Sequence, residues 1–350
     1  MNNSEILMNA FSESFFFKEL TFSELEFYVD KEHKVELADL LINLGDSVLA
    51  IQLKARDKDA QTNDISKEMK WVEKKCKAAK SQIGDTIAYI RNHNLKFKSN
   101  YGQEVIIDSK VEIVPLVVFM NDLNLEYDHI LKKHDSDGLD VNCISFSDYC
   151  AMCKELISPG EIIAYLKWRK NFYLKNGNVN LLITDTKWGM TISKPQHRES
   201  LVTQYLIEMY GEDVVFEDKG YLLKFNEFLS VLSEHTVHTS EDDANVEIIK
   251  LLAHFYHNEI TNFVIKVEDA LLKAKNKKQN KISGSLRNIE RKSVIAFIAS
   301  KEGEFVNPEY LYEIASEKCE VDTLLQVIVY WVNDMEYRID FWLYKEVSNG

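Results

Sequence analysis

Three polar residues near the start of the chain interrupt apolar runs and are of types that could do chemistry. Asp39 lies in the run LADLLIN, and Gln52 and Lys54 lie in the next run, VLAIQLKA. Both runs are predicted strands, and Gly45-Asp46 between them is a tight-turn signal that predicts a hairpin. Residues two apart on a strand project from the same face. The hairpin therefore brings the Gln52 and Lys54 pair close to Asp39.

These residue types suit the hydrolysis of a phosphodiester. The reaction near neutral pH needs a metal ion to activate water and to neutralise developing charge, and Mg²⁺ prefers hard oxygen ligands. Asp39 and the amide of Gln52 offer such oxygens, and Lys54 offers a cation beside the attacking water. The alternative is structural, with Asp39 as an acid at a strand edge and Lys54 as its salt-bridge partner. In both cases the polar groups need partners, because unpaired buried polar atoms are costly.

Helices are expected on both sides of this hairpin. Residues 3–13 have apolar positions at helical spacing, and residues 64–93 predict one long helix with Asp64 as its N-cap. Its apolar stripe, at spacings of three and four, is Ile65, Met69, Val72, Cys76, Ala79, Ile83, Ile87 and Ile90. The two strands of the hairpin are predicted at 34–44 and 47–55. A further strand is predicted at 111–120, and a second hairpin at 95–108. The order of these elements favours a mixed sheet flanked by helices.

The pattern D-x12-Q-x-K on this hairpin, between a first helix and a long lysine-rich helix, resembles the PD-(D/E)XK or restriction-endonuclease-like nuclease superfamily. Here Gln52 stands where the usual motif has an acid, a variant that the superfamily contains. The resemblance covers residues 1–170 and extends to nucleases of bacterial defence systems. It implies a restriction-endonuclease-like α/β fold that cleaves DNA, or alternatively RNA.

The resemblance also implies roles for individual residues. Asp39 would bind Mg²⁺ or Mn²⁺, together with the amide oxygen of Gln52 and the main-chain carbonyl of Leu53. Lys54 would orient and activate the attacking water. A glutamate of the first helix often joins such sites, and Glu13 is the first choice, ahead of Glu5 and Glu19.

Replacing an acid by Gln52 removes one negative charge near the metal. A catalytically silent nuclease-like protein that binds nucleic acid or a partner protein is therefore the alternative function. For the nuclease, a homodimer is expected because cutting both strands commonly needs two active centres, and a partner defence protein is the other partner considered.

The formal net charge of −14 is unevenly distributed. Residues 65–96 hold eight Lys or Arg against three acids, and residues 273–292 hold eight against one. Local positive surface is what attracts a phosphate backbone. The predicted nucleic-acid contacts are Lys67, Lys70, Lys74 and Lys77, with Gln82 facing the active centre. The alternative is a solvated helix face, and residues 273–287 are expected to be a basic linker.

The length of 350 residues suits two domains. A composition shift at residues 174–180 divides the chain into a nuclease-like domain, 1–175, and a mixed α+β accessory domain, 176–350. The chain contains neither a GxxxxGK[ST] nor a GxGxxG motif, so a nucleotide-binding fold is not expected. Apolar runs approaching the roughly 18 residues of a membrane span are absent, and the start lacks a basic signal region. A cytoplasmic protein with no membrane contact is expected.

Five cysteines in a chain of this length do not indicate a disulfide framework. Cys150 and Cys153 form a CxxC, which is interpreted as buried free thiols. The alternative is a zinc site completed by Cys143 and by His129 or His134. His254 and His257, three residues apart on a predicted helix, are interpreted as surface or packing residues.

Overall fold

The chain forms two compact units in the computed structural model. The first comprises Met1–Glu217 and Ile249–Phe255, and the second comprises Asp218–Ile248 and Tyr256–Gly350. The predicted boundary at 175/176 falls inside the first unit. The residues that the structure describes are 3–23, 25–28, 34–56, 64–93, 96–120, 130–131, 139–176, 201–211, 219–235, 244–276, 281–288, 291–301, 322–333 and 336–345.

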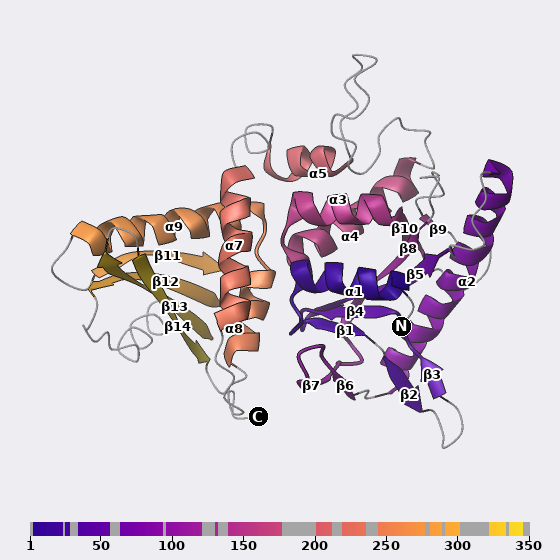
Figure 1. Ribbon diagram of the computed structural model, residues 1–350, viewed down its shortest axis with the longest axis horizontal. Helices are drawn as coiled ribbons and strands as arrows, with labels where there is room; N and C mark the ends of the chain where they lie inside the picture. Colours follow the sequence, from indigo (N-terminus) through magenta and orange to yellow (C-terminus); the bar gives the residue numbers. More distant parts are fainter. Residues whose placement is uncertain are drawn as a thin grey trace, which may run out of the picture. The chain divides into compact units, whose positions relative to one another are not determined.

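A six-stranded mixed sheet is the centre of the first unit (Figure 1). Its order is β1 (Thr21–Ser23), β4 (Leu40–Asn43), β5 (Ser47–Ala55), β8 (Glu112–Met120), β10 (Val141–Ser145) and β9 (Ile130–Leu131). β4 and β5 form an antiparallel hairpin, whereas β5, β8 and β10 run parallel. The mixed sheet flanked by helices that the sequence predicts is therefore confirmed.

Helix α2 (Ile65–Asn92) covers the face of this sheet that bears Gln52 and Lys54. Val117 lies beside Gln52 in the register of β5 and β8, and it packs against Cys76 and Ile83 of α2. Near its other end, α2 packs through Ile90 into a second cluster with residues of β4 and β5. The predicted N-cap is confirmed, because the Asp64 side chain accepts hydrogen bonds from the main-chain N–H groups of residues 66 and 67.

Helices α3 (Phe146–Leu156) and α4 (Pro159–Asn176) lie on the opposite face. Arg169 of α4 is fully buried and donates to Asn142, which points away from α2. Helix α1 (Asn3–Phe16) joins this layer through a 3.1 Å hydrogen bond between Ser12 and Tyr149. The smaller elements of the unit are the hairpin β2 (Glu26–Tyr28) and β3 (Lys34–Glu36), the hairpin β6 (Lys96–Lys98) and β7 (Glu104–Ile106), and α5 (Leu201–Tyr210).

Two predicted segments differ in the structure. The single strand predicted at 34–44 is wrong, because the chain bends at residues 37–39 between β3 and β4. The Leu37 N–H bonds to the Leu25 carbonyl, which extends the pairing of β2 with β3 by one residue, so the chain turns into the six-stranded sheet only after residue 37. The linker predicted at 273–287 is also wrong. Helix α9 (His257–Asn276) continues into it, and β11 (Lys281–Asn288) ends it.

The second unit contains a four-stranded sheet in the order β11, β12 (Ser293–Lys301), β13 (Thr323–Asn333) and β14 (Glu336–Lys345). β12 and β13 are parallel, and the other two pairs are antiparallel. Helix α9 packs on one face, where Phe263 lies within 5.6 Å, ring centre to ring centre, of Phe225 and Phe297. Helix α7 (Lys219–His235) packs against α9, and α8 (Ala244–Ala253) is divided between the two units. Among the helices described in either unit, none has the length and apolar character to cross a membrane.

Candidate active site

Asp39 lies in the bend immediately before β4 and is joined to β5 by its side chain. Its Oδ2 accepts a 2.7 Å hydrogen bond from Gln52 Nε2 and a 2.5 Å hydrogen bond from the Leu53 N–H. The β4–β5 ladder starts at the pair Leu40 and Ile51, so no main-chain carbonyl of β4 is available to Leu53. The carboxylate takes the place of that carbonyl. The structure therefore brings together Asp39 and the Gln52-Leu53 pair, as the motif predicts.

Gln52 is a buried amide on a largely apolar strand. The side chain is 4% exposed, and among the described residues its Oε1 has no hydrogen-bond partner. The amide orientation follows from its neighbour, because an ionised carboxylate only accepts and so selects the NH₂ group. An unpaired buried acceptor costs about 1–3 kcal/mol. The apolar strands thus hold one polar oxygen that a ligand could satisfy.

Lys54 is half-buried and lies on the same face of β5 as Gln52. In the register with β8, Gln52 is opposite Val117 and Lys54 is opposite Phe119, both of which belong to the apolar cluster under α2. The predicted shared face is therefore confirmed. A lysine in this position can present its ammonium at the rim of the sheet next to the Gln52 amide.

The Leu53 carbonyl is directed to the same side as its N–H, because both main-chain groups of a strand residue point to one neighbour. That side is the one occupied by the Asp39 carboxylate. Asp39, the free Gln52 oxygen and this carbonyl make a set of hard oxygen donors, which suits Mg²⁺ or Mn²⁺. Among the residues described, no cluster of three or more His, Cys, Asp or Glu side chains accompanies them. One carboxylate with neutral oxygens predicts weak metal binding.

Glu13 is not brought to this cluster. Its carboxylate accepts hydrogen bonds from Asn100, at 2.7 Å, and from Asn9, at 3.1 Å. Asn100 lies along the outer edge of β1, where its N–H donates to the Thr21 carbonyl and its Oδ1 accepts the Ser23 N–H. Strands β1 and β4 therefore separate Glu13 from β5. The helix that carries a residue can be predicted from sequence, but the edge of the sheet that it reaches cannot.

Glu19, one of the two other acids considered, also lies away from Asp39. It is buried and immediately precedes β1, whose first residue, Thr21, pairs with Ile42 near the far end of β4. Asp39 precedes the near end of that strand. The antiparallel pairing of β1 and β4 therefore places Glu19 near the opposite end of β4 from Asp39.

The lysines predicted to contact nucleic acid form an exposed surface along α2. They are Lys67, Lys70, Lys74 and Lys77. Two of them have acidic neighbours on the helix, since Lys67 lies 3.6 Å from Asp64 and Lys77 lies 2.6 Å from Glu73. The Lys77 ammonium holds the pKa of Glu73 below its usual value. Because these exposed pairs are weak, Lys67 and Lys77 can exchange an intrahelical carboxylate for a phosphate.

Gln82 is exposed and lies one helical turn before Thr86. The Thr86 hydroxyl is hydrogen-bonded to the main-chain carbonyl of Leu37, two residues before Asp39. This side of α2 therefore faces the bend that carries Asp39. The position of Gln82 agrees with the predicted orientation toward the candidate site.

Arg56 is a residue of this face that the sequence analysis did not consider. Its guanidinium lies 3.1 Å from the buried Glu68 carboxylate and 5.3 Å from the ring centre of Trp71. These contacts fix the end of β5 to the start of α2. The signal was present in the sequence, because Gln52, Lys54 and Arg56 follow one another at the strand period of two.

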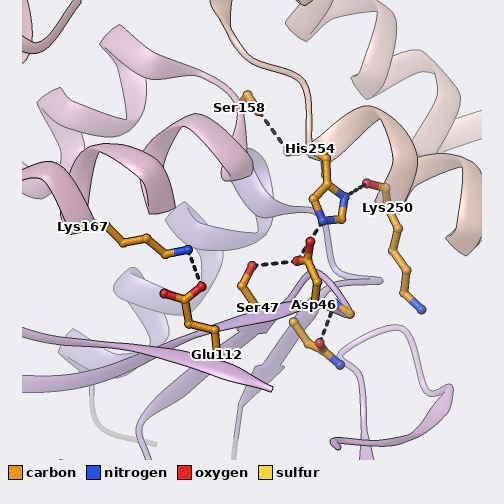
Figure 2. Close-up of polar contacts among 10 residues, drawn as sticks. Asp46, Ser47, Glu112, Ser158, Lys167, Lys250 and His254 are labelled. Atoms are coloured by element: carbon orange, nitrogen blue, oxygen red, sulfur yellow. Dashed lines mark hydrogen bonds and ion pairs between the residues drawn. The ribbon is translucent and has the colours of Figure 1, made fainter. Parts of the chain in front are cut away.

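A second polar cluster lies at the turn end of β5, away from Gln52 (Figure 2). Asp46 accepts hydrogen bonds from the Ser47 hydroxyl at 2.9 Å and from His254 Nε2 at 3.0 Å. His254 Nδ1 lies 2.6 Å from the Lys250 carbonyl, so both ring nitrogens face acceptors. Asp46 stands between Ser47 and His254, which is the wrong order for a serine nucleophile activated by a histidine.

The cysteines considered as metal ligands have the surroundings of structural thiols. Cys153 is fully buried on α3, and burial raises its pKa and raises the pKa of Cys150 to about 11. Neutral thiols are poor metal ligands and poor nucleophiles. Cys143 lies 3.8 Å from Cys76 inside the core under α2. His129 and His134 lie outside the described residues.

Comparison of the chain with protein-family models, with curated proteins and with solved structures gives no match.

Proposed function

We propose that the first unit hydrolyses phosphodiester bonds of DNA in a metal-dependent reaction, with a PD-(D/E)XK-type site at Asp39, Gln52 and Lys54. The observation that carries this proposal is the Gln52 amide, whose Nε2 donates to Asp39 Oδ2 and whose Oε1 is buried and without a hydrogen-bond partner among the described residues. Buried acceptors are almost always satisfied. A side chain that is bonded to a carboxylate and carries such an oxygen can offer it to a cation bound there.

The residues of the site would have different roles in the reaction, according to their positions. The Asp39 carboxylate, the Gln52 oxygen and the Leu53 carbonyl would hold Mg²⁺ or Mn²⁺. When bound, the ion would lower the pKa of water and neutralise charge on the phosphate. Lys54, two residues beyond Gln52 on the same face, would orient the attacking water and stabilise the charge that develops.

The exposed lysines of α2 support a polyanionic substrate. Lys67, Lys70, Lys74 and Lys77 lie on the helix that covers the face bearing Gln52 and Lys54. Several ammonium groups on one helix attract a phosphate backbone, and the attraction weakens with salt. The expected role in bacterial defence against phage follows from the resemblance of residues 1–170 to defence nucleases.

A second candidate function is a nuclease-like binding module without catalysis. One observation favours it: Asp39 Oδ2 already accepts two hydrogen bonds from β5. A carboxylate that completes the strand ladder has a structural role that needs no metal. This function and the first differ in whether divalent cations bind through Asp39.

Cleavage of supercoiled plasmid by the full chain with Mg²⁺ or Mn²⁺ tests the proposal, beside Asp39→Ala and Lys54→Ala. Asp85→Ala, at an exposed position of α2, is the matched control. Loss of nicking in the first two variants, with normal circular dichroism and an active control, supports the site. If wild type cuts neither plasmid, single-stranded DNA nor RNA, and calorimetry shows no Mn²⁺ binding that depends on Asp39, the binding module is the correct function.

A further inference from the structure

The two edges of the sheet in the second unit differ in how open they are to another strand. On β11, the pairing with β12 shifts between Ile282 and Gly284. A Cβ built on Gly284 would lie 2.8 Å from the Lys266 side chain of α9, and Lys273 of the same helix bonds to Ser283. A register shift and a covering helix are two ways in which proteins protect an edge strand.

Strand β14 differs from β11 in where its pairing shifts: the register shift with β13 lies at the very start of the strand, between Trp331 and Asn333, and the rest of β14 is regular. It pairs with β13 without interruption from Tyr337 to Lys345, and β13 is its sole neighbour among the described strands. Its side chains are also unusually apolar for an edge. Tyr337 is 53% exposed and Trp342 is 45% exposed, and Ile339 and Phe341 are partly exposed between them. A long, regular and apolar edge is a template for pairing with another chain.

We propose that β14 pairs antiparallel with β14 of a second copy of this chain, joining two four-stranded sheets into one. Such a dimer has a two-fold axis perpendicular to the sheet, which keeps each face on its own side. Directly opposite residues must then lie on the same face of the sheet. Each possible register is therefore centred on one residue of β14, which lies opposite its own copy across the axis, and the other residues pair symmetrically about it.

Charge selects among the registers. An axis through Arg338 or through Asp340 places that charged residue opposite itself, which is destabilising. An axis through Ile339 places Arg338 opposite Asp340 twice and Tyr337 opposite Phe341 twice. Opposite charges and aromatic pairs are the cross-strand combinations that stabilise sheets. An axis through Phe341 avoids like charges but forms no ion pair. Among these four registers, the one centred on Ile339 is the self-complementary one.

In one copy, Arg338 already lies 3.0 Å from Asp340 and 4.7 Å from the ring centre of Tyr330. Both charged side chains are thus on one face of β14, and in the dimer each would meet its opposite from the second copy. Tyr337 and Phe341 lie on the other face, where Phe341 packs 5.5 Å from Phe228, ring centre to ring centre. This inference does not depend on the proposed nuclease activity.

The test measures the mass of the full chain by size-exclusion chromatography with light scattering, over a range of concentrations. Wild type should give twice 40.7 kDa. Arg338→Asp and Asp340→Arg each place like charges opposite one another and should weaken the dimer about tenfold. The double variant Arg338→Asp/Asp340→Arg exchanges the charges and should restore it. A monomer at all concentrations, or a dimer that is insensitive to either single variant, would overturn the proposal.

Disulfide cross-linking tests the register separately from the charges. Ile339→Cys places two thiols on the symmetry axis, so mild oxidation should give a covalent dimer on a non-reducing gel. Trp342→Cys, on the other face and three positions from the axis, is the matched control and should remain monomeric on the gel. Wild type reports the background from the native cysteines. Equal cross-linking of the two variants, or none with Ile339→Cys, would refute the register.

Discussion

The polar side chains at the two ends of β5 differ in how completely they are hydrogen-bonded. At the turn end, Asp46 is bonded to Ser47 and His254, and Glu112 is paired with Lys167 at 2.6 Å (Figure 2). At the other end, Asp39 is bonded to Gln52, whose own oxygen has no partner among the described residues. The charged side chains at the turn end thus have partners, whereas Gln52 Oε1 at the other end has none among the described residues.

This difference distinguishes a structural cluster from a candidate site. Polar groups at a protein surface can be satisfied by water, whereas buried groups depend on the fold. Asp46 has hydrogen-bond partners at the surface, whereas the buried Gln52 oxygen has none among the described residues. The free-energy cost of that missing hydrogen bond lies at a position where a bound ligand could offset it.

The largest effect is expected at Asp39. Asp39→Ala removes the acid from the proposed metal site and should lower plasmid nicking at least about 100-fold. It also leaves the Leu53 N–H and the Gln52 amide without their acceptor, which should destabilise the unit by about 1–3 kcal/mol. Nicking rates and urea unfolding measure the two effects. Asp39→Asn keeps one acceptor and should lose the same activity with a smaller loss of stability. Full activity in both variants would place the chemistry elsewhere.

The next effect is expected at Gly160, beside the turn end. A Cβ there would lie 2.9 Å from the main chain of His254, and main chain cannot move aside cheaply. Gly160→Ala should therefore destabilise the first unit by about 1–3 kcal/mol without affecting metal binding at Gln52. Thermal unfolding and Mn²⁺ calorimetry measure these separately. Gly220→Ala is the matched control, because that position has open space. Equal melting temperatures for the two variants would show that the close approach is absent in solution.

Much of the candidate site could be predicted because its signals are local. The bounds of β5, the cap of α2 at Asp64 and the shared face of Gln52 and Lys54 follow from periodicity and from neighbouring residue types. The bend at Asp39 could not be predicted, since it depends on the Leu37–Leu25 hydrogen bond and on a carboxylate replacing a main-chain acceptor.

Long-range placements were equally out of reach of the sequence. Glu13 reaches the outer edge of β1 because Asn100, 87 residues away in sequence, binds there. The basic stretch at 273–287 has the composition of a linker, yet it contains the end of α9 and most of β11. The position of Glu13 and the structure of residues 273–287 both depend on pairing with residues distant in sequence. The composition of a segment contains no information on such pairing.

Gln52→Glu restores the acid that the motif usually has and so tests whether position 52 takes part in metal binding. Without metal, a second carboxylate about 2.7 Å from Asp39 Oδ2 should destabilise the fold through like-charge repulsion. With Mn²⁺, the same pair should bind the ion more tightly than wild type. The rise in melting temperature on adding Mn²⁺ should therefore be larger in the variant than in wild type. If metal shifts neither protein, the Gln52 oxygen has no role in cation binding.

The smallest effect is expected at Asp46, although its carboxylate has two hydrogen-bond partners. Its side chain is 62% exposed, and exposed ion pairs contribute about 0–1 kcal/mol because water and salt screen them. Asp46→Ala should lower the free energy of unfolding by no more than this, and nicking should be unchanged. Urea unfolding at low and high salt measures it, with wild type and variant converging as salt rises. A loss of several kcal/mol, or a loss of nicking, would mean that the His254 contact controls the hairpin that carries Gln52, and the two ends of β5 would then be coupled.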